Sequence, residues 1–195
     1  MTVQTVSKRQ APAAKRKSLL TGEELLAMGD MGRAELVKGE LIRISPTGFL
    51  HGIIESNFGK KISAFVDQHQ LGVVVVGEVG IYTRRNPDTV RGADAAFISN
   101  ERLAQRKSSG YLDVAPELIV EVLSPGDSWS EMNEKLEEYF AIGVQQVWVA
   151  DPRRRQIAVY HSPTRLEHLS DSDTLTSGDV LPGFSAPVAE MFGEM

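Results

Sequence analysis

Three acidic residues stand at positions where the surrounding pattern calls for apolar side chains. Side chains alternate between the two faces of a β-strand, so Glu121 in the segment LIVEV shares a face with Ile119 and Leu123. Asp94 lies within GADAAFIS, and Glu40 lies within a segment that is typical of a hairpin. Burial of an ionised carboxylate is costly unless a metal ion, a cation or hydrogen bonds compensate it. We therefore expect these carboxylates to share such a partner.

Carboxylates that converge at the edge of a sheet form an oxygen-rich site of the kind that binds Mg²⁺ or Mn²⁺. Phosphodiester hydrolysis is the natural use of such a site. A nearby cation would orient the attacking water or offset the charge that develops on the phosphate. Lys135 is the candidate, because it lies next to the apolar stripe of a predicted helix. An ordinary surface pair with Glu131, four residues earlier, is the alternative interpretation.

The common nucleotide-binding and hydrolase motifs are absent from the sequence. It has no Walker-type phosphate loop, no Gly-x-Gly-x-x-Gly, no His-Glu-x-x-His and no Gly-x-Ser-x-Gly. The absence of cysteine excludes disulfides, thiolate nucleophiles and thiolate-bound zinc, and it is typical of a reducing compartment. No apolar run is long enough to span a membrane, and no signal peptide is recognisable. We expect a soluble, cytoplasmic protein with no membrane partner.

The charge is distributed unevenly along the 195 residues. Residues 1–17 carry five basic and no acidic side chains, which leaves 16 basic against 26 acidic residues in the remainder. A net charge of −10 on this remainder argues against unspecific coating of nucleic acid. The length and the 42% hydrophobic content predict one domain over residues 18–195, preceded by a disordered basic tail over residues 1–17.

The spacing of apolar residues predicts the elements that must position these side chains. Apolar residues at three- and four-residue steps over 49–70 predict an amphipathic helix that covers a sheet. A capping box of Ser128 and Glu131 begins a second long helix, and Gly143 ends it. The other predicted elements are a short helix at 21–28, a hairpin at 34–45 and strands at 72–83, 92–99, 117–124, 145–151, 155–161 and 165–170. This order predicts an α/β fold with a mixed sheet and helices on both faces.

The segments AELVKGELIRISPTGFLHG, RGADAAFIS and APELIVEVLSPGDSWSEMNEKLEEYFAIGVQQVWVADP resemble the Uma-two family of restriction-endonuclease-like proteins. The most specific part is EVLSP, followed by a helix with Lys and Tyr and then by GV and WVADP. The resemblance runs from about residue 33 to the LPGF near the C-terminus. This family belongs to the PD-(D/E)xK nuclease superfamily. The resemblance therefore implies a restriction endonuclease-like fold, a mixed central β-sheet flanked by helices.

The resemblance also implies roles for individual residues. Asp94 and Glu121 are similar to the two motif acids that bind the metal ion, and Glu40 resembles an additional acid that completes or orients the metal shell. The lysine that the superfamily has two residues after the second acid is Leu123 here. By the resemblance, Lys135 on the following helix supplies this catalytic cation instead.

Two polar residues near the expected site each allow two interpretations. The family has a histidine at the position of His51, which implies a contact with the substrate phosphate or with the metal ligands. A lone histidine at a helix entry can equally be a packing residue. Ser124 either forms a hydrogen bond within the site or only shapes the Ser-Pro turn.

We expect from these residues a metal-dependent endonuclease that hydrolyses DNA phosphodiester bonds with Mg²⁺ or Mn²⁺ as cofactor. Restriction-like nucleases often cut two strands with two copies of one site, so a homodimer is expected. The alternative is a catalytically inactive nuclease fold that acts as a nucleic-acid or protein interaction module. The acidic net charge and the missing lysine favour this alternative, whereas the retained acids favour the enzyme.

Overall fold

The computed structural model describes residues 19–29 and 32–193, so the basic tail expected over residues 1–17 lies outside the described ranges. None of the helices within these ranges is long and apolar enough to cross a membrane. The elements in chain order are α1 Gly22–Ala27, β1 Ala34–Val37, β2 Glu40–Arg43, α2 Phe49–His69, β3 Gly72–Arg84, β4 Thr89–Ser99, α3 Asn100–Leu103, β5 Leu118–Val122, α4 Trp129–Ala141, β6 Gln146–Asp151, β7 Gln156–Ser162, β8 Arg165–Leu169, β9 Thr174–Thr176, β10 Ser185–Pro187 and α5 Val188–Phe192.

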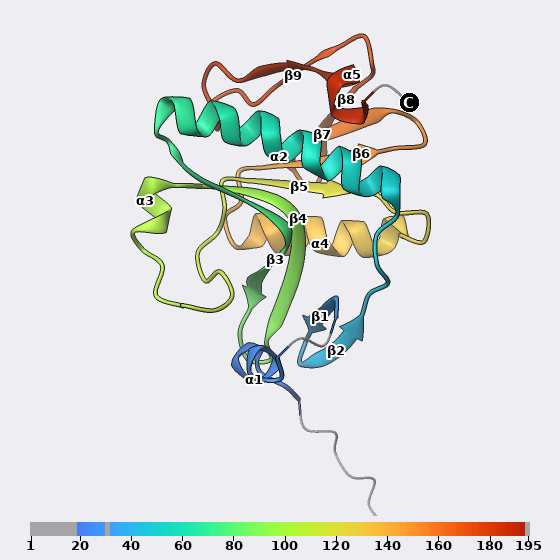
Figure 1. The fold of residues 1–195 in the computed structure, drawn as a ribbon. Helices are drawn as coiled ribbons and strands as arrows, with labels where there is room; N and C mark the ends of the chain where they lie inside the picture. The colour runs from blue at the N-terminus through green and yellow to red at the C-terminus, as the bar shows by residue number, and fades with distance from the viewer. Residues whose placement is uncertain (1–18, 30–31, 194–195) are drawn as a thin grey trace, which may run out of the picture.

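An eight-stranded mixed sheet forms the centre of the molecule (Figure 1). Its strand order is β2-β1-β4-β5-β6-β7-β8, and β3 pairs with β4. The pair β5 and β6 is parallel and is joined by the crossover helix α4, whereas the other paired strands of this sheet run antiparallel. Each helix and strand that the sequence pattern predicts is present, so the predicted α/β fold with a mixed sheet is confirmed.

The two long helices cover opposite faces of the sheet, α2 above it and α4 below it in Figure 1. Ile54 and Phe58 of α2 are buried in one core with Val120 of β5. Leu136 of α4 is buried in a second core with Ile119 of β5. Alternate residues of β5 therefore enter different cores, which explains why this central strand is apolar on both faces.

The C-terminal segment packs on the outer side of α2. Met191 and Phe192 of α5 are buried in the same core as α2, and the Nδ2 atom of Asn57 donates a hydrogen bond to the carbonyl of Met191 at 3.2 Å. The strands β9 and β10 form a separate two-stranded sheet in this segment. The sequence pattern does not predict β9 and β10, because strands of three residues are too short to show a hydrophobic period.

One edge of β4 is shared by two strands that do not meet. The strand β1 pairs with β4 at Leu36 and Val90, and β5 pairs with it over residues 95–97. The strand β3 occupies the opposite edge of β4 at both places. Residues 91–94 of β4 therefore face a gap between β1 and β5, and side chains of the described residues must satisfy the backbone there.

The packing of α2 yields a prediction about stability. Phe58 is 0% exposed and its ring centroid lies 6.1 Å from that of Trp148, so Phe58→Ala should lower the free energy of unfolding by about 3–5 kcal/mol. Phe49 begins the same helix but is 85% exposed, and Phe49→Ala should change it by less than about 0.5 kcal/mol. Urea unfolding of both variants measures the difference. Similar losses in the two variants would contradict the packing described.

Candidate active site

The side chain of Lys135 extends from α4 into the gap between β1 and β5. Its Nζ atom lies 3.0 Å from Oε1 of Glu35 on β1 and 3.3 Å from Oε2 of Glu121 on β5. It also donates a hydrogen bond to the carbonyl of Gly92 on β4 at 3.3 Å. Lys135 does not form the alternative surface pair with Glu131, because the side chain of Glu131 caps the start of α4. One partly buried ammonium group therefore connects three strands.

Glu35 lies opposite Lys135 and helps to close the gap. Its Oε1 atom accepts the backbone N–H of Gly92 at 3.1 Å, and its Oε2 atom accepts a hydrogen bond from Arg91 at 3.0 Å. The two backbone groups of Gly92 are thus satisfied by side chains where a neighbouring strand is missing. Burial raises the pKa of Glu35, but the charges of Lys135 and Arg91 outweigh it and hold the pKa below its ordinary value. Glu35 is therefore ionised at neutral pH.

Arg91 extends the network of charges away from the gap. Its Nε and Nη2 atoms donate to the two carboxylate oxygens of Glu138 at 2.7 and 2.9 Å, a bidentate pair. Thr83 donates a further hydrogen bond to Glu138 at 3.0 Å. Burial opposes the charge of Arg91, but Glu138 and Glu35 raise its pKa above the ordinary value. The guanidinium is a fixed positive charge that holds Glu35 in place.

Glu121 is the buried carboxylate of β5, on the face that packs against α4. Its side chain receives a hydrogen bond of 2.6 Å from the hydroxyl of Tyr139, in addition to the contact with Lys135. Burial raises the pKa of Glu121 to about 7 against the opposing charge of Lys135, and the negative charge of Asp94 adds to the rise. The ionised form of this carboxylate is therefore only partly compensated by the protein.

Asp94 lies where β4 and β5 separate. Its Oδ2 atom accepts the backbone N–H of Val122 at 2.6 Å, and its Oδ1 atom lies 3.1 Å from Nε2 of His51. The pairing of β4 with β5 ends at Ala95 and Val120. Asp94 precedes Ala95 and Glu121 follows Val120, so the two acids lie beside each other at this end of the ladder. The structure brings the two predicted motif acids together.

His51 begins a short chain of hydrogen bonds behind Asp94. A carboxylate only accepts hydrogen bonds, so Nε2 of His51 donates to Asp94, and Nδ1 lies 3.1 Å from the hydroxyl of Ser124. His51 and Ser124 therefore both lie at the site. In a neutral ring Nδ1 accepts the hydroxyl proton of Ser124.

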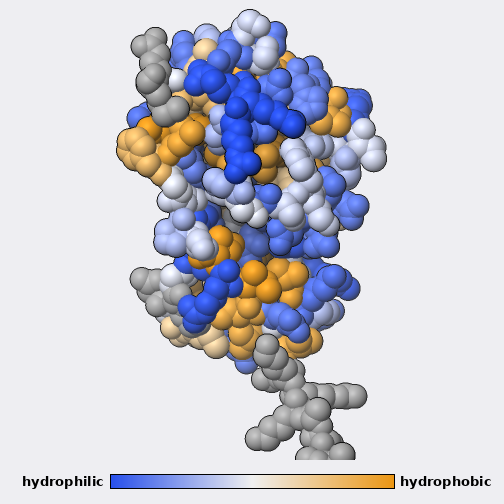
Figure 2. Space-filling model, turned by 90° about the vertical axis from the view of Figure 1, so that its right-hand side faces the viewer, coloured by the Kyte–Doolittle hydropathy of each residue, from blue (hydrophilic) through white to orange (hydrophobic). Residues whose placement is uncertain are grey.

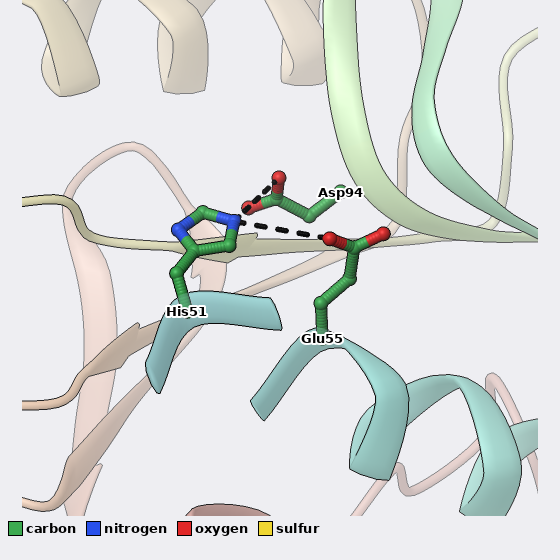
Figure 3. Close-up of side chains that lie close together, drawn as sticks. All are labelled: His51, Glu55 and Asp94. Carbon is green, nitrogen blue, oxygen red and sulfur yellow. Dashed lines mark hydrogen bonds and ion pairs between the residues drawn. The ribbon is translucent and has the colours of Figure 1, made fainter. Parts of the chain in front are cut away.

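Glu55 adds a third potential metal ligand beside His51 and Asp94. Figure 3 shows the three side chains converging, two from α2 and one from β4, and their ligand atoms lie within 4.8 Å of one another. Burial and the charge of Asp94 raise the pKa of Glu55. Nothing in the sequence pattern singled out Glu55 beyond its position one helical turn after His51.

The structure does not bring Glu40 to the other candidate residues. Glu40 and Glu35 lie on the same face of the hairpin, because Glu40 pairs with Val37 and Glu35 pairs with Ile42. Glu40, however, lies at the turn end of the hairpin, where its side chain is exposed and does not line the cavity at the gap. Glu35, which the sequence pattern did not single out, occupies the gap instead.

A cavity of about 710 Å³ opens at the gap. Its wall includes Glu35, Asp94, Glu121, Lys135 and His51. Figure 2 shows the side of the molecule that carries the starts of α2 and α4, and this side is hollowed between a larger upper part and a smaller lower part. Buried carboxylates and a partly buried cation therefore meet in a space that a ligand can enter.

Comparisons with known proteins give the same fold, a mixed central sheet flanked by helices, which is that of a restriction endonuclease-like protein. The chain belongs to the Uma2 (Uma-two) family, described as "putative restriction endonuclease", whose model matches residues 23–189. The crystal structure of a putative nuclease belonging to DUF820 from Anabaena variabilis is 18% identical, with a TM-score of 0.75 over 89% of this chain and 97% of that chain. No curated protein matches the chain. The family and the fold expected from the sequence are confirmed.

The raised pKa of Glu121 predicts how the stability of the metal-free protein depends on pH. This carboxyl titrates near 4.5 in the unfolded chain and near 7 in the folded protein, so the free energy of unfolding falls as the pH rises through that interval. Glu121→Gln has no carboxyl to titrate at this position, so its free energy of unfolding should not fall for this reason. The difference in free energy of unfolding between Glu121→Gln and the wild type should therefore shift in favour of the variant by roughly 2–3 kcal/mol from about pH 5 to 8. Urea unfolding at both pH values measures it. A difference in free energy of unfolding between the variant and the wild type that does not change with pH would contradict the raised pKa of Glu121.

Proposed function

We propose that this protein is a metal-dependent endonuclease that hydrolyses phosphodiester bonds of DNA. The observation that carries the proposal is the meeting of Glu121, Asp94 and Lys135 at one gap in the sheet, next to an open cavity. The family description and the nuclease-like fold support the same reaction class. In this proposal Lys135 supplies the cation that is missing at the position of Leu123, and its place at the gap weakens the argument for an inactive domain.

Asp94 and Glu121 fit a divalent metal ion of the Mg²⁺ or Mn²⁺ type. Both offer hard carboxylate oxygens, and the raised pKa of the buried Glu121 shows that its charge is incompletely compensated by the protein's own cations. When bound, such an ion lowers the pKa of a water molecule and neutralises charge on the phosphate. His51 holds Asp94 in position through its hydrogen bond, with Ser124 behind it.

Lys135 acts as a permanent cation in this proposal. Burial opposes its charge, but Glu121 and Glu35 raise its pKa above the ordinary value, so it does not serve as a proton acceptor at neutral pH. It orients the attacking water or offsets the negative charge that develops on the phosphate. Glu35, and not Glu40, is then the N-terminal acid of the site, because Glu35 holds this ammonium at 3.0 Å.

We further propose that the active form is a homodimer. The described residues of one chain provide one such site, and two copies of it are needed to cut both strands of a duplex. Light scattering should therefore give the mass of two chains.

Cleavage assays test the proposed catalytic residues. Wild-type protein should cut supercoiled plasmid or single-stranded DNA with Mg²⁺ or Mn²⁺ and should be inert in EDTA. Glu121→Ala and Lys135→Ala should each lower the rate by about 100-fold or more, because charge stabilisation in the transition state is lost. Glu35→Gln should lower the rate strongly, whereas Glu40→Gln, as the matched control, should stay near the wild type. If all of these proteins are equally inert or equally active, the enzyme proposal fails and an interaction module is favoured.

Thermal unfolding tests the metal site independently of cleavage. A bound ion stabilises the folded state, by about 2.7 kcal/mol when its concentration is about 100 times the Kd, so Mn²⁺ should raise the Tm of the wild type. Asp94→Ala should abolish this rise. Asp179→Ala removes an exposed acid between β9 and β10 and should leave the rise intact. The same rise in both variants would show that Asp94 does not bind the ion.

A further inference from the structure

Two exposed aromatic side chains flank the candidate active site. Phe49 is the first residue of α2 and is 85% exposed, and Trp129 is the first residue of α4 and is 48% exposed. Both line a second cavity of about 400 Å³. This volume is in the range of about 300–1,000 Å³ that is usual for small-molecule sites. Exposed aromatic rings around a cavity of this size indicate a binding surface.

The second cavity adjoins the cavity at the gap between β1 and β5. Residues shared by the two linings include His51 and Ser124, which form the hydrogen-bonded chain behind Asp94. The other shared residues are Gly48, Pro125, Asp127 and Ser128. A DNA strand whose scissile phosphate lies at Asp94 can therefore continue into this second cavity with its neighbouring nucleotide.

Two exposed arginines supply positive charge at the second cavity. Arg153 and Arg154 lie in the turn between β6 and β7, and their backbone N–H groups both donate to Oδ1 of Asp151, at 2.9 and 3.2 Å. The Nη2 atom of Arg153 donates to the carbonyl of Pro125 at 3.3 Å, which holds this guanidinium at the cavity. Figure 2 shows strongly hydrophilic and apolar residues side by side on the upper part of this face.

The two acids that line the cavity are engaged in its turns. Asp151 accepts the backbone groups of the arginine turn, and its Oδ2 atom lies 3.8 Å from Nε of Arg154. Asp127 accepts the backbone N–H of Ser124 at 2.7 Å. Hydrogen bonds thus hold both acids in the turns, and the two guanidinium groups share the cavity lining with the aromatic rings. Aromatic rings that stack on bases, combined with cations that contact the backbone, are the usual means of binding single-stranded nucleic acid.

We propose that this cavity, formed by Phe49, Trp129, Arg153 and Arg154, binds an unpaired base of the DNA strand beside the scissile phosphate. The base stacks on the two rings, and the arginines contact the adjoining phosphate. A paired base inside a duplex does not offer its faces for stacking. The cavity therefore takes a base of single-stranded DNA or, in a duplex that the dimer cuts on both strands, a base displaced from its pair. This inference rests on the proposed nuclease function and specifies its substrate.

Tryptophan fluorescence tests the stacking directly. The chain has two tryptophans, and Trp148 is fully buried, so quenching by an oligothymidylate in EDTA reports on Trp129. We expect single-stranded oligothymidylate to quench this emission and a blunt duplex of the same length to quench it much less. Because EDTA prevents metal-dependent cleavage, the titration measures binding alone.

Matched variants separate the proposed contacts from general effects. Phe49→Ala should weaken oligothymidylate binding by about 5-fold or more, and the double change Arg153→Ala with Arg154→Ala should reduce the slope of log affinity against log salt by about 0.7, because one phosphate contact is lost. Leu166→Ala and Arg165→Ala on β8 are exposed, line neither cavity, and should leave binding unchanged.

The outcomes distinguish this inference from the proposed function. Quenching that depends on Phe49 in a protein that never cuts DNA would support the binding site and refute the nuclease. Cleavage without quenching, or an effect of Phe49→Ala no larger than that of Leu166→Ala, would overturn the binding site and leave the nuclease standing. Conversion of a dimer to a monomer by Phe49→Ala, with unchanged binding of DNA, would also overturn it and assign the rings to a subunit interface.

Discussion

The arrangement of the site depends on one partly buried ammonium group held between two buried carboxylates. Lys135 lies between Glu35 and Glu121 at the place where β4 lacks a neighbouring strand. Buried charges are tolerated only when each is paired and hydrogen-bonded. The alternation of charge extends over five side chains, Glu138, Arg91, Glu35, Lys135 and Glu121. A strand in the gap would satisfy the backbone of Gly92 directly, but it would fill the cavity in which the acids meet.

The placement of the two long helices explains why the proposed catalytic residues and the proposed base-binding residues occur together. The helices α2 and α4 cover opposite faces of the sheet but begin on the same side of the molecule (Figure 1). The first turn of α2 supplies both Phe49 and His51, and α4 supplies Trp129 and, farther along, Lys135. The cavity at the gap and the cavity with the aromatic rings are therefore adjacent, because both helices begin on the same side of the molecule. Their shared lining suits a substrate longer than a single nucleotide.

The sequence predicted those parts of the structure that carry a local signal. Periodic apolar residues predicted α2, and a capping box with a terminating glycine predicted α4. The position of an acid where an apolar residue is expected singled out Glu121 and Asp94. The hairpin held two acids on one face, and only the tertiary position of β4 determines that Glu35 and not Glu40 reaches the gap. The partners of Lys135 were likewise undecided by spacing, since Glu131 and the sheet were both within reach of it. The network through Arg91 and Glu138 joins distant elements and has no local pattern.

The central claim is that Asp94 and Glu121 share a divalent metal ion beside Lys135. The most direct measurement is the anomalous diffraction of crystals soaked in Mn²⁺. We expect an anomalous peak between the carboxylates of Asp94 and Glu121, and its loss in crystals of Glu121→Gln. A peak confined to His51 and Glu55, or no peak near these residues at saturating Mn²⁺, would contradict the account.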